Sequence, residues 1–145
     1  KKIYGILKTR TDIKVGYMPQ DYKEVLNYDK TPIEFLKDNE SNETLVRNYM
    51  GNMKFTSEEM IGKIKNLSGD SRAKLLILKM ILDKNNVLIL DEPTRNVSPL
   101  SNPVIREALI DFKGTIISVS HDRKYINEVR DNVYELTNNG LVKIN

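Results

Sequence analysis

The sequence predicts an α/β domain with parallel strands, a small helical insert and a C-terminal β-hairpin. Residues 87–90 form an uninterrupted apolar run, which is typical of a strand buried on both faces of a parallel sheet. This run leads directly into two carboxylates, Asp91 and Glu92. A second predicted buried strand, residues 115–119, ends just before Ser120 and His121. Because open α/β sheets bind ligands at the carboxyl ends of their strands, these polar residues mark the expected site.

The composition favours one globular domain. The chain has 145 residues, of which 30% are charged and 39% apolar, with a net charge of +3. This mildly basic charge permits an anionic partner such as RNA without indicating one. The absence of Cys excludes disulfides and thiolate metal sites. No membrane segment is predicted and residues 1–3 do not open a signal peptide, so we expect a cytoplasmic protein. A first residue of Lys, not Met, is consistent with a piece of a longer protein.

Before the central apolar run, the pattern predicts two strands and then helices. Residues 3–7 and 13–17 suit the arms of a β-hairpin around a polar tip. Residues 31–65 contain three short helical signals, two of which are capping boxes that begin at Thr31 and Thr56. After a break at residues 67–70, apolar residues wrap more than one face of the next helix, so this helix should be largely buried.

After the central run, Pro103 should begin a helix that Gly114 ends. Residues 115–119 should form a second buried strand, and Asp122 suits the N-cap of a short helix. Two further strands flank Asn139-Gly140, which is a hairpin turn signal.

Five short segments that contain polar residues occur in a recognisable order along the chain. They are Gln20 after a strand, Leu67-Ser68-Gly69 before a helix, Asp91-Glu92 after a strand, residues 93–98 as a loop, and His121 after a strand. This order resembles the nucleotide-binding domain of ABC ATPases, from its Q-loop to its end, over essentially the whole chain. The resemblance implies a partial P-loop NTPase core. It divides the chain into a remnant of the antiparallel β subdomain (1–18), a Q-loop and helical subdomain (19–66), and a core with the signature, Walker B, D-loop and H-loop (67–145).

Two strings resemble the ABC-F branch in particular, whose members act on the ribosome. Ser120-His121-Asp122-Arg123 matches the branch at its switch histidine, and residues 91–101 are similar to the second domain of antibiotic-resistance members. The resemblance implies the C-terminal part of a ribosome-protection ATPase, with the ribosome and a second nucleotide-binding domain of the same parent chain as partners. Two alternatives stay open: the ATPase subunit of an ABC transporter, and a non-catalytic binding module.

The resemblance also implies roles for four residues, with ATP and Mg²⁺ as cofactors. Gln20 would reach Mg²⁺ and the attacking water, and Asp91 would hold Mg²⁺. Glu92 would act as general base, and His121 would hydrogen-bond the γ-phosphate. From the residues alone, Gln20 suits a loop-stabilising amide as well.

The signature would act on the ATP of the opposing domain. Ser68, Gly69 and Asp70 would meet its γ-phosphate, and Ser98 of the D-loop would also take part in nucleotide binding. Ser68 equally suits a plain helix N-cap. The sequence departs from the family here, because Asp70 stands where the family has Gly, and Ser98 replaces the D-loop Asp. Phosphate binding by this signature is therefore in doubt, although Asp70 also suits a cap of the helix.

No G-x-x-x-x-G-K-[ST] phosphate loop (Walker A) occurs in the chain. By the resemblance, we expect this ATP-binding segment to lie before residue 1 and the 145 residues alone to be inactive. The missing strand should leave an open sheet edge, through which copies of the chain could pair.

Overall fold

A three-stranded parallel sheet forms the centre of the computed structural model, which describes residues 6, 8–38 and 42–144. Its strands are β1 (Val15–Met18), β2 (Val87–Asp91) and β3 (Thr115–Val119), in the order β1-β2-β3. The predicted α/β class with parallel strands is confirmed. All three strands run in the same direction, so their carboxyl ends meet at one edge of the sheet.

The strand predicted at residues 13–17 pairs differently from the expectation. Val15 lies opposite Val87 in a parallel ladder, so β1 belongs to the core sheet and is not the second arm of an antiparallel hairpin. Most of the other predicted arm, residues 3–5 and 7, lies outside the described residues. An alternating strand next to a polar tip suits either pairing, and the contact with β2 decides it.

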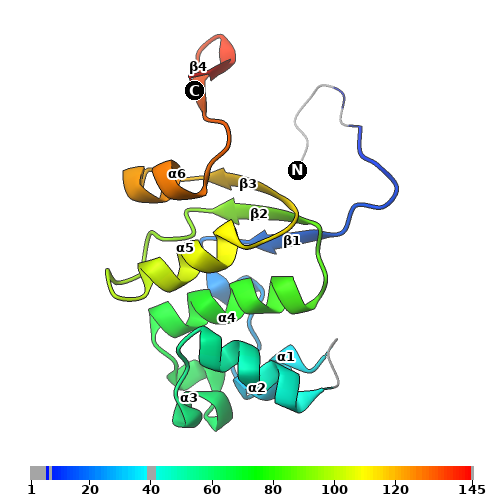
Figure 1. Ribbon diagram of the computed structural model, residues 1–145, viewed down its shortest axis with the longest axis vertical. Coiled ribbons are helices and arrows are strands. Elements are labelled where there is room, and N and C mark those ends of the chain that lie inside the picture. Colours follow the sequence, from blue (N-terminus) through cyan, green and yellow to red (C-terminus); the bar gives the residue numbers. More distant parts are fainter. Residues whose placement is uncertain (1–5, 7, 39–41, 145) are drawn as a thin grey trace.

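The helices lie in two groups on one side of the sheet (Figure 1). α4 (Gly69–Leu82) and α5 (Asn102–Ile110) lie against the sheet, and α6 (Arg123–Val129) follows β3. Beyond α4 lies the predicted helical insert, which is confirmed. Its helices are α1 (Pro32–Leu36), α2 (Glu43–Asn52), α3 (Ser57–Ile61) and a short 3-10 helix, Ile64–Asn66. Another 3-10 helix, Tyr22–Glu24, precedes the insert.

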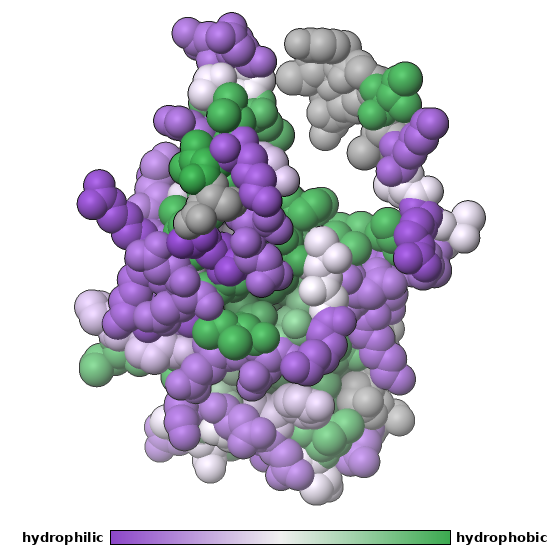
Figure 2. All heavy atoms as spheres, turned by 45° about the horizontal axis from the view of Figure 1, so that its top comes forward, coloured by the Kyte–Doolittle hydropathy of each residue, from purple (hydrophilic) through white to green (hydrophobic). Residues whose placement is uncertain are grey.

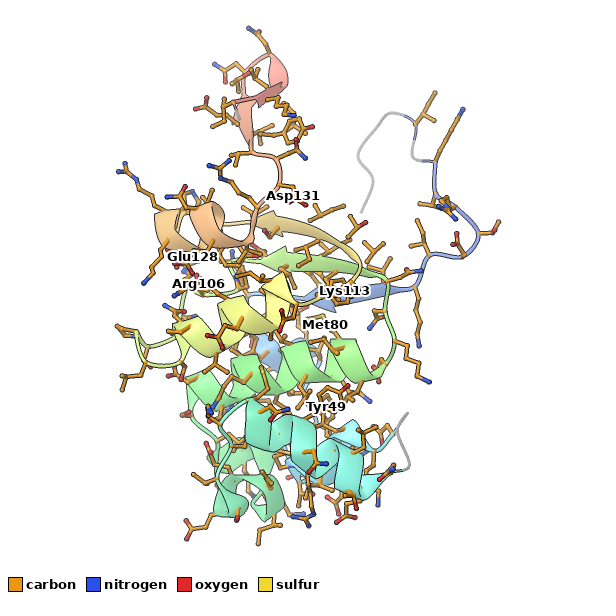
Figure 3. The ribbon with its side chains drawn as sticks, viewed as in Figure 1. Tyr49, Met80, Arg106, Lys113, Glu128 and Asp131 are labelled. Carbon is orange, nitrogen blue, oxygen red and sulfur yellow. The ribbon has the colours of Figure 1, made fainter. Side chains whose placement is uncertain are left out.

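The local helix signals are largely confirmed. Thr31 and Thr56 each form a complete capping box, and Asp122 caps α6. α4 is mostly buried, as its apolar pattern predicts, and places Met80 against the sheet beside Gly16 (Figure 3). The predicted C-terminal hairpin is present as β4 (Tyr134–Thr137) and β5 (Gly140–Lys143), which stand apart from the core in Figure 1.

The two faces of the sheet differ in their burial. Met18, Leu88 and Leu90 point toward the helices and are buried. On the other face, which we call the outer face, five apolar side chains are partly exposed, and Figure 2 shows green apolar atoms gathered there. They are Val15, Tyr17, Ile89, Ile117 and Val119.

Residues 115–119 therefore form a strand as predicted, but the prediction that this strand is buried is wrong. Ile117 is 58% exposed and Val119 60% exposed. β3 is an edge strand within the described part of the chain, and no described helix covers its outer face. β1 is the other edge strand among the described residues. That an absent strand leaves one edge open, and that copies pair through it, stays a prediction.

Gly114 does not cap α5, because Asp111 is the C-cap residue. Instead, Gly114 allows a close approach of two segments. A Cβ at this position would lie 2.4 Å from the backbone oxygen of Asn86 and 2.5 Å from the Phe112 ring. The same Asn86 oxygen accepts a hydrogen bond from the Thr115 amide at 3.0 Å, where β3 begins beside β2.

We expect Gly114→Ala to lower the free energy of unfolding by about 1–3 kcal/mol, because the added methyl group overpacks this contact. Urea unfolding followed by circular dichroism measures the change. Gly51→Ala is the matched control: Gly51 lies in α2 and a Cβ there would meet nothing within 4 Å. This control should be neutral or stabilising by up to about 1 kcal/mol. Equal stabilities of the two variants would contradict the steric explanation.

Candidate functional site

The first pair of predicted site residues lies at the ends of β1 and β2. Gln20 follows β1 and its Nε2 donates to Oδ1 of Asp91 at 3.2 Å. These two residues line a hollow of about 280 Å³. The other residues that line it are Asp21, Tyr22, Glu92, Arg95 and Asn96. The amide of Gln20 and the carboxylate of Asp91 therefore lie at the ends of neighbouring strands and line the same hollow.

The second pair joins the ends of β2 and β3. Glu92 has φ +52°, a left-handed conformation that is uncommon outside glycine and costs about 1–3 kcal/mol. Its amide donates to the carbonyl oxygen of Val119 at 2.9 Å. Its carboxylate is hydrogen-bonded by Nδ1 of His121 and, at 3.3 Å, by the His121 amide. Because a carboxylate only accepts, this bond requires the imidazole proton on Nδ1.

The two side chains of this pair differ sharply in exposure. The Glu92 side chain is 11% exposed and the His121 side chain 90% exposed. Glu92 is therefore held by its backbone and neighbours, whereas His121 faces solvent and is free to contact an incoming ligand.

The segment around His121 is attached to the core on two sides. Thr94 is buried, and its hydroxyl donates to Oδ2 of Asp122 at 2.9 Å. Further along α6, Glu128 forms an ion pair with the buried Arg106 of α5, and the two lie close together in Figure 3. The Thr94 contact fixes the start of α6, and with it the backbone of His121, whereas the Glu128 ion pair fixes the end of the helix.

Asp122 has a lowered pKa. Burial raises the pKa of this carboxyl, but hydrogen bonds from the Tyr125 amide, the Thr94 hydroxyl and the Lys124 amide outweigh burial and hold the pKa below its ordinary value of 3.8. The folded protein thus binds this proton more weakly than the unfolded chain. The stabilisation is complete above the unfolded pKa and is lost as the pH falls toward the folded pKa.

We therefore expect the free energy of unfolding to fall between about pH 5 and pH 3, and to fall less steeply in Asp122→Asn. Asn is a good N-cap, so this variant keeps the cap while it removes the titrating carboxyl. Urea unfolding at a series of pH values measures both slopes. Identical slopes in the wild type and the variant would contradict a role of Asp122 in acid sensitivity.

The predicted signature residues lie at the N-terminus of α4. Ser68 is the N-cap and accepts from the Ser71 amide at 3.1 Å, so the alternative that Asp70 caps the helix is wrong. Asp70 instead bonds the D-loop, which we define as residues 93–98. Its Oδ1 accepts from the Ser98 amide at 2.9 Å, and its Oδ2 accepts from the Ser98 hydroxyl.

The Asp70 carboxyl is also affected by this contact. Burial raises its pKa, but the hydrogen bonds from the side chain and amide of Ser98 and from the Ser101 side chain outweigh burial, and the net pKa is lowered. Ser68 and Gly69 are exposed, and a Cβ on Gly69 would lie 3.6 Å from the Asn96 carbonyl. Gly69 is thus not required for packing within the chain.

The donor set fits a magnesium–nucleotide complex in part. Mg²⁺ prefers oxygen ligands and is commonly held by one or two carboxylates together with phosphate oxygens and water. Asp91 supplies one carboxylate and Gln20 one amide oxygen at the same hollow. Within the described ranges, no group of three His, Cys, Asp or Glu residues could hold a metal by itself. The phosphates would therefore have to complete the coordination.

Sequence reasoning did not assign a role to Arg95 or Thr94. Arg95 lines the hollow, and its Nη1 donates to Oε1 of Gln20 at 3.3 Å, which orients the amide. The signal for Arg95 was present as a cation three residues after Glu92. Thr94 gave no such signal, because its partner Asp122 lies 28 residues away in the chain.

Comparisons with known proteins agree with this arrangement. The family model described as ABC transporter matches residues 3–95. A putative ATP-binding protein, YdiF of Bacillus subtilis (strain 168), is 36% identical over 139 residues, covering 94% of this chain and 22% of YdiF. The ribosome protection protein VmlR of the same organism is 34% identical over 134 residues, covering 89% of this chain and 24% of VmlR. The chain thus spans about a quarter or less of the length of these relatives.

A solved structure supports the fold. The dimeric, post-hydrolysis form of the ATP-binding cassette MJ0796, bound to ADP and Pi, superposes with a TM-score of 0.65 at 18% identity, covering 78% of this chain and 54% of that one. At this identity the likeness concerns the fold alone. None of the helices in the described residues has the length and apolarity that crossing a membrane requires.

Proposed function

Because this chain belongs to the ABC transporter family of ATPase domains, we propose that it is the C-terminal part of a nucleotide-binding domain in an ABC-F protein that acts on the ribosome. Members of the family in general bind and hydrolyse ATP. The branch is proposed from the VmlR and YdiF similarity together with the strings Ser120–Arg123 and 91–101. Cytoplasmic location and ribosome binding belong to the same proposal.

One observation carries the ATPase proposal. The carboxyl ends of three adjacent parallel strands bring together Gln20, Asp91, Glu92 and His121, which come from widely separated parts of the chain. Each of these side chains contacts another of the four. Such a cluster at the ligand-binding edge of a parallel sheet suits phosphoryl transfer, in which the protein mainly positions groups and stabilises charge.

We assign the chemistry of hydrolysis to two of these residues. Glu92 is shielded and anchored by its backbone, so it can orient the attacking water and accept its proton. His121 is exposed, so its ring could turn away from Glu92 and donate its Nδ1 proton to a phosphate oxygen instead. Asp91 and Gln20 would hold Mg²⁺, which when bound neutralises phosphate charge. Arg95 donates to the same Gln20 amide oxygen, so the ion would meet the second lone pair of that oxygen.

The exposed residues at the start of α4 would serve the opposing domain. Ser68 and Gly69 face solvent, and Asp70 and Ser98 lie beside them. We propose that this surface meets the γ-phosphate of ATP held by the second nucleotide-binding domain. The 145-residue chain would then require both that domain and a phosphate loop for turnover.

The test is ATP hydrolysis by the complete protein that carries this chain, measured alone, with purified ribosomes and with membrane vesicles. We expect ribosomes to stimulate turnover and vesicles to have no effect. Stimulation by a membrane partner with no response to ribosomes would replace the ABC-F proposal with that of a transporter subunit. Absence of hydrolysis under every condition would favour a non-catalytic binding module.

A further inference from the structure

We propose that Asp70 is a positioning residue that holds the D-loop against the N-terminus of α4, so that both present one rigid surface to the opposing domain. The inference rests on the proposed function, because it concerns ATP turnover between two domains. Within this chain, the partner of Asp70 is Ser98, and the role of Asp70 is to hold the D-loop in place.

The contact is a two-point attachment. One carboxylate oxygen of Asp70 accepts from the Ser98 backbone amide at 2.9 Å and the other accepts from the Ser98 hydroxyl. Ser98 Oγ in turn accepts from the Ser101 amide at 3.4 Å. A charged acceptor that engages the backbone and the side chain of the same residue restricts both position and rotation of the loop. Both residues are partly buried, so water competes less for these bonds.

The segment is also held from its other side. Ser71 is buried and its hydroxyl donates to the Glu59 carboxylate of α3, while the Ser68 hydroxyl lies 3.1 Å from that of Ser71. Ser68 and Gly69 are therefore exposed, but the two residues that follow them are bonded. Asp70 is bonded to the D-loop and Ser71 to the helical insert. A surface fixed in this way needs little reordering when it meets a ligand.

The D-loop connects this surface to the candidate general base. The Arg95 amide donates to the carbonyl of Glu92 at 3.1 Å, and the Val97 amide donates to the carbonyl of Thr94 at 3.2 Å. Glu92 thus immediately precedes the short, internally bonded D-loop, and Ser98 is the last residue of that loop. If Asp70 releases Ser98, the loop loses its attachment at the end distant from Glu92, and the position of the base is less well defined.

The first measurement is hydrogen exchange in the complete protein without nucleotide, followed by mass spectrometry of a peptide that spans residues 93–101. We expect amides of this peptide to exchange about tenfold faster or more in Asp70→Ala, because the loop opens more often. Asp131→Ala, which removes an exposed carboxylate after α6, is the matched control and should leave exchange unchanged. Unchanged exchange in Asp70→Ala would overturn the inference.

The second measurement is ribosome-stimulated ATP hydrolysis. We expect Asp70→Ala and Ser98→Ala to lower kcat by about tenfold to a hundredfold with little change in KM, since misplacement affects the transition state more than binding. The double variant should lose no more than Asp70→Ala, because Asp70→Ala already removes both bonds to Ser98, whereas Ser98→Ala removes only the hydroxyl bond. Ser98→Thr keeps the hydroxyl and the amide and should restore most of the turnover.

Thermal unfolding of each variant separates positioning from stability. A kcat per folded molecule that equals the wild-type value in Asp70→Ala, with only a lower Tm, would reduce Asp70 to a structural residue and overturn the inference. The proposed function is tested independently by Glu92→Gln. If Glu92→Gln abolishes turnover while Asp70→Ala keeps it, the proposed function stands and the inference fails. If Glu92→Gln hydrolyses ATP like the wild type, both fail.

Discussion

Replacing Glu92 by Gln should lower the kcat of the complete protein by about 10²–10⁴-fold, which is the usual contribution of a positioned general base. The substitution preserves the size of the side chain, and the amide oxygen of Gln can still accept from His121. The backbone of residue 92, with φ +52°, and its amide bond to Val119 need not change. The loss should therefore appear in kcat with KM for ATP little altered, because binding groups stay in place.

Steady-state hydrolysis with ribosomes measures this effect, and Glu107→Gln is the matched control. Glu107 is an exposed acid on α5, outside the hollow, so its replacement should keep wild-type turnover. With ATP bound but not hydrolysed, the Glu92→Gln protein should also stay on ribosomes in a sedimentation assay. Wild-type turnover in Glu92→Gln would remove Glu92 from the mechanism.

The 145-residue chain by itself should bind Mg-ATP at least about a thousandfold more weakly than the complete protein, a difference of roughly 4 kcal/mol. The chain contains no phosphate loop to surround the phosphates with backbone N–H groups and a lysine. The hollow at the strand ends is lined by three carboxylates and one guanidinium. Without the phosphate loop, this excess of negative charge repels the triphosphate.

Titration calorimetry of the chain with Mg-ATP, beside the complete protein as positive control, measures this difference. Circular dichroism and urea unfolding of the same sample establish that the chain is folded. Micromolar or tighter binding by the 145 residues would show that the residues at the strand ends hold nucleotide without a phosphate loop. The proposal that a phosphate loop is required for ATP binding would then be wrong.

Local signals in the sequence predicted much of the fold because they act over a few residues. The spacing of Thr31 and Glu34 predicts a capping box, and both of its hydrogen bonds are present. The turn at Asn139-Gly140 and the cap at Asp122 were predicted in the same way. Burial of α4 followed from the number of apolar residues alone.

Local signals could not predict which strands pair with each other or which faces of the sheet are covered. The alternation around Tyr17 is the same in an antiparallel hairpin and in a parallel edge strand, and only β2 distinguishes them. The β-branched stretch that contains Ile117 indicates a strand, but it does not say what covers each face. Among the described residues, nothing covers the face that carries Ile117 and Ile89.

For the candidate site, the strand-end rule placed Asp91, Glu92 and His121 correctly at one edge of the sheet. The roles of these residues stay predictions. The bond between Asp70 and Ser98 could not be foreseen, because the two residues lie 28 positions apart and neither shows a periodic pattern. The sequence showed only that each departs from the family.

The order of the strands also has a consequence for folding kinetics. β1 is separated from β2 by the whole helical insert and α4, whereas β2 and β3 are separated by one loop and α5. Contacts of large sequence separation require the closure of long loops, so they tend to form late. Among the described residues β1 pairs with β2 alone, and its opening would part Gln20 from Asp91 while Glu92 and His121 stay in contact. The two halves of the site therefore differ in lifetime: the acid–imidazole pair should form earlier and persist longer than the amide–carboxylate pair.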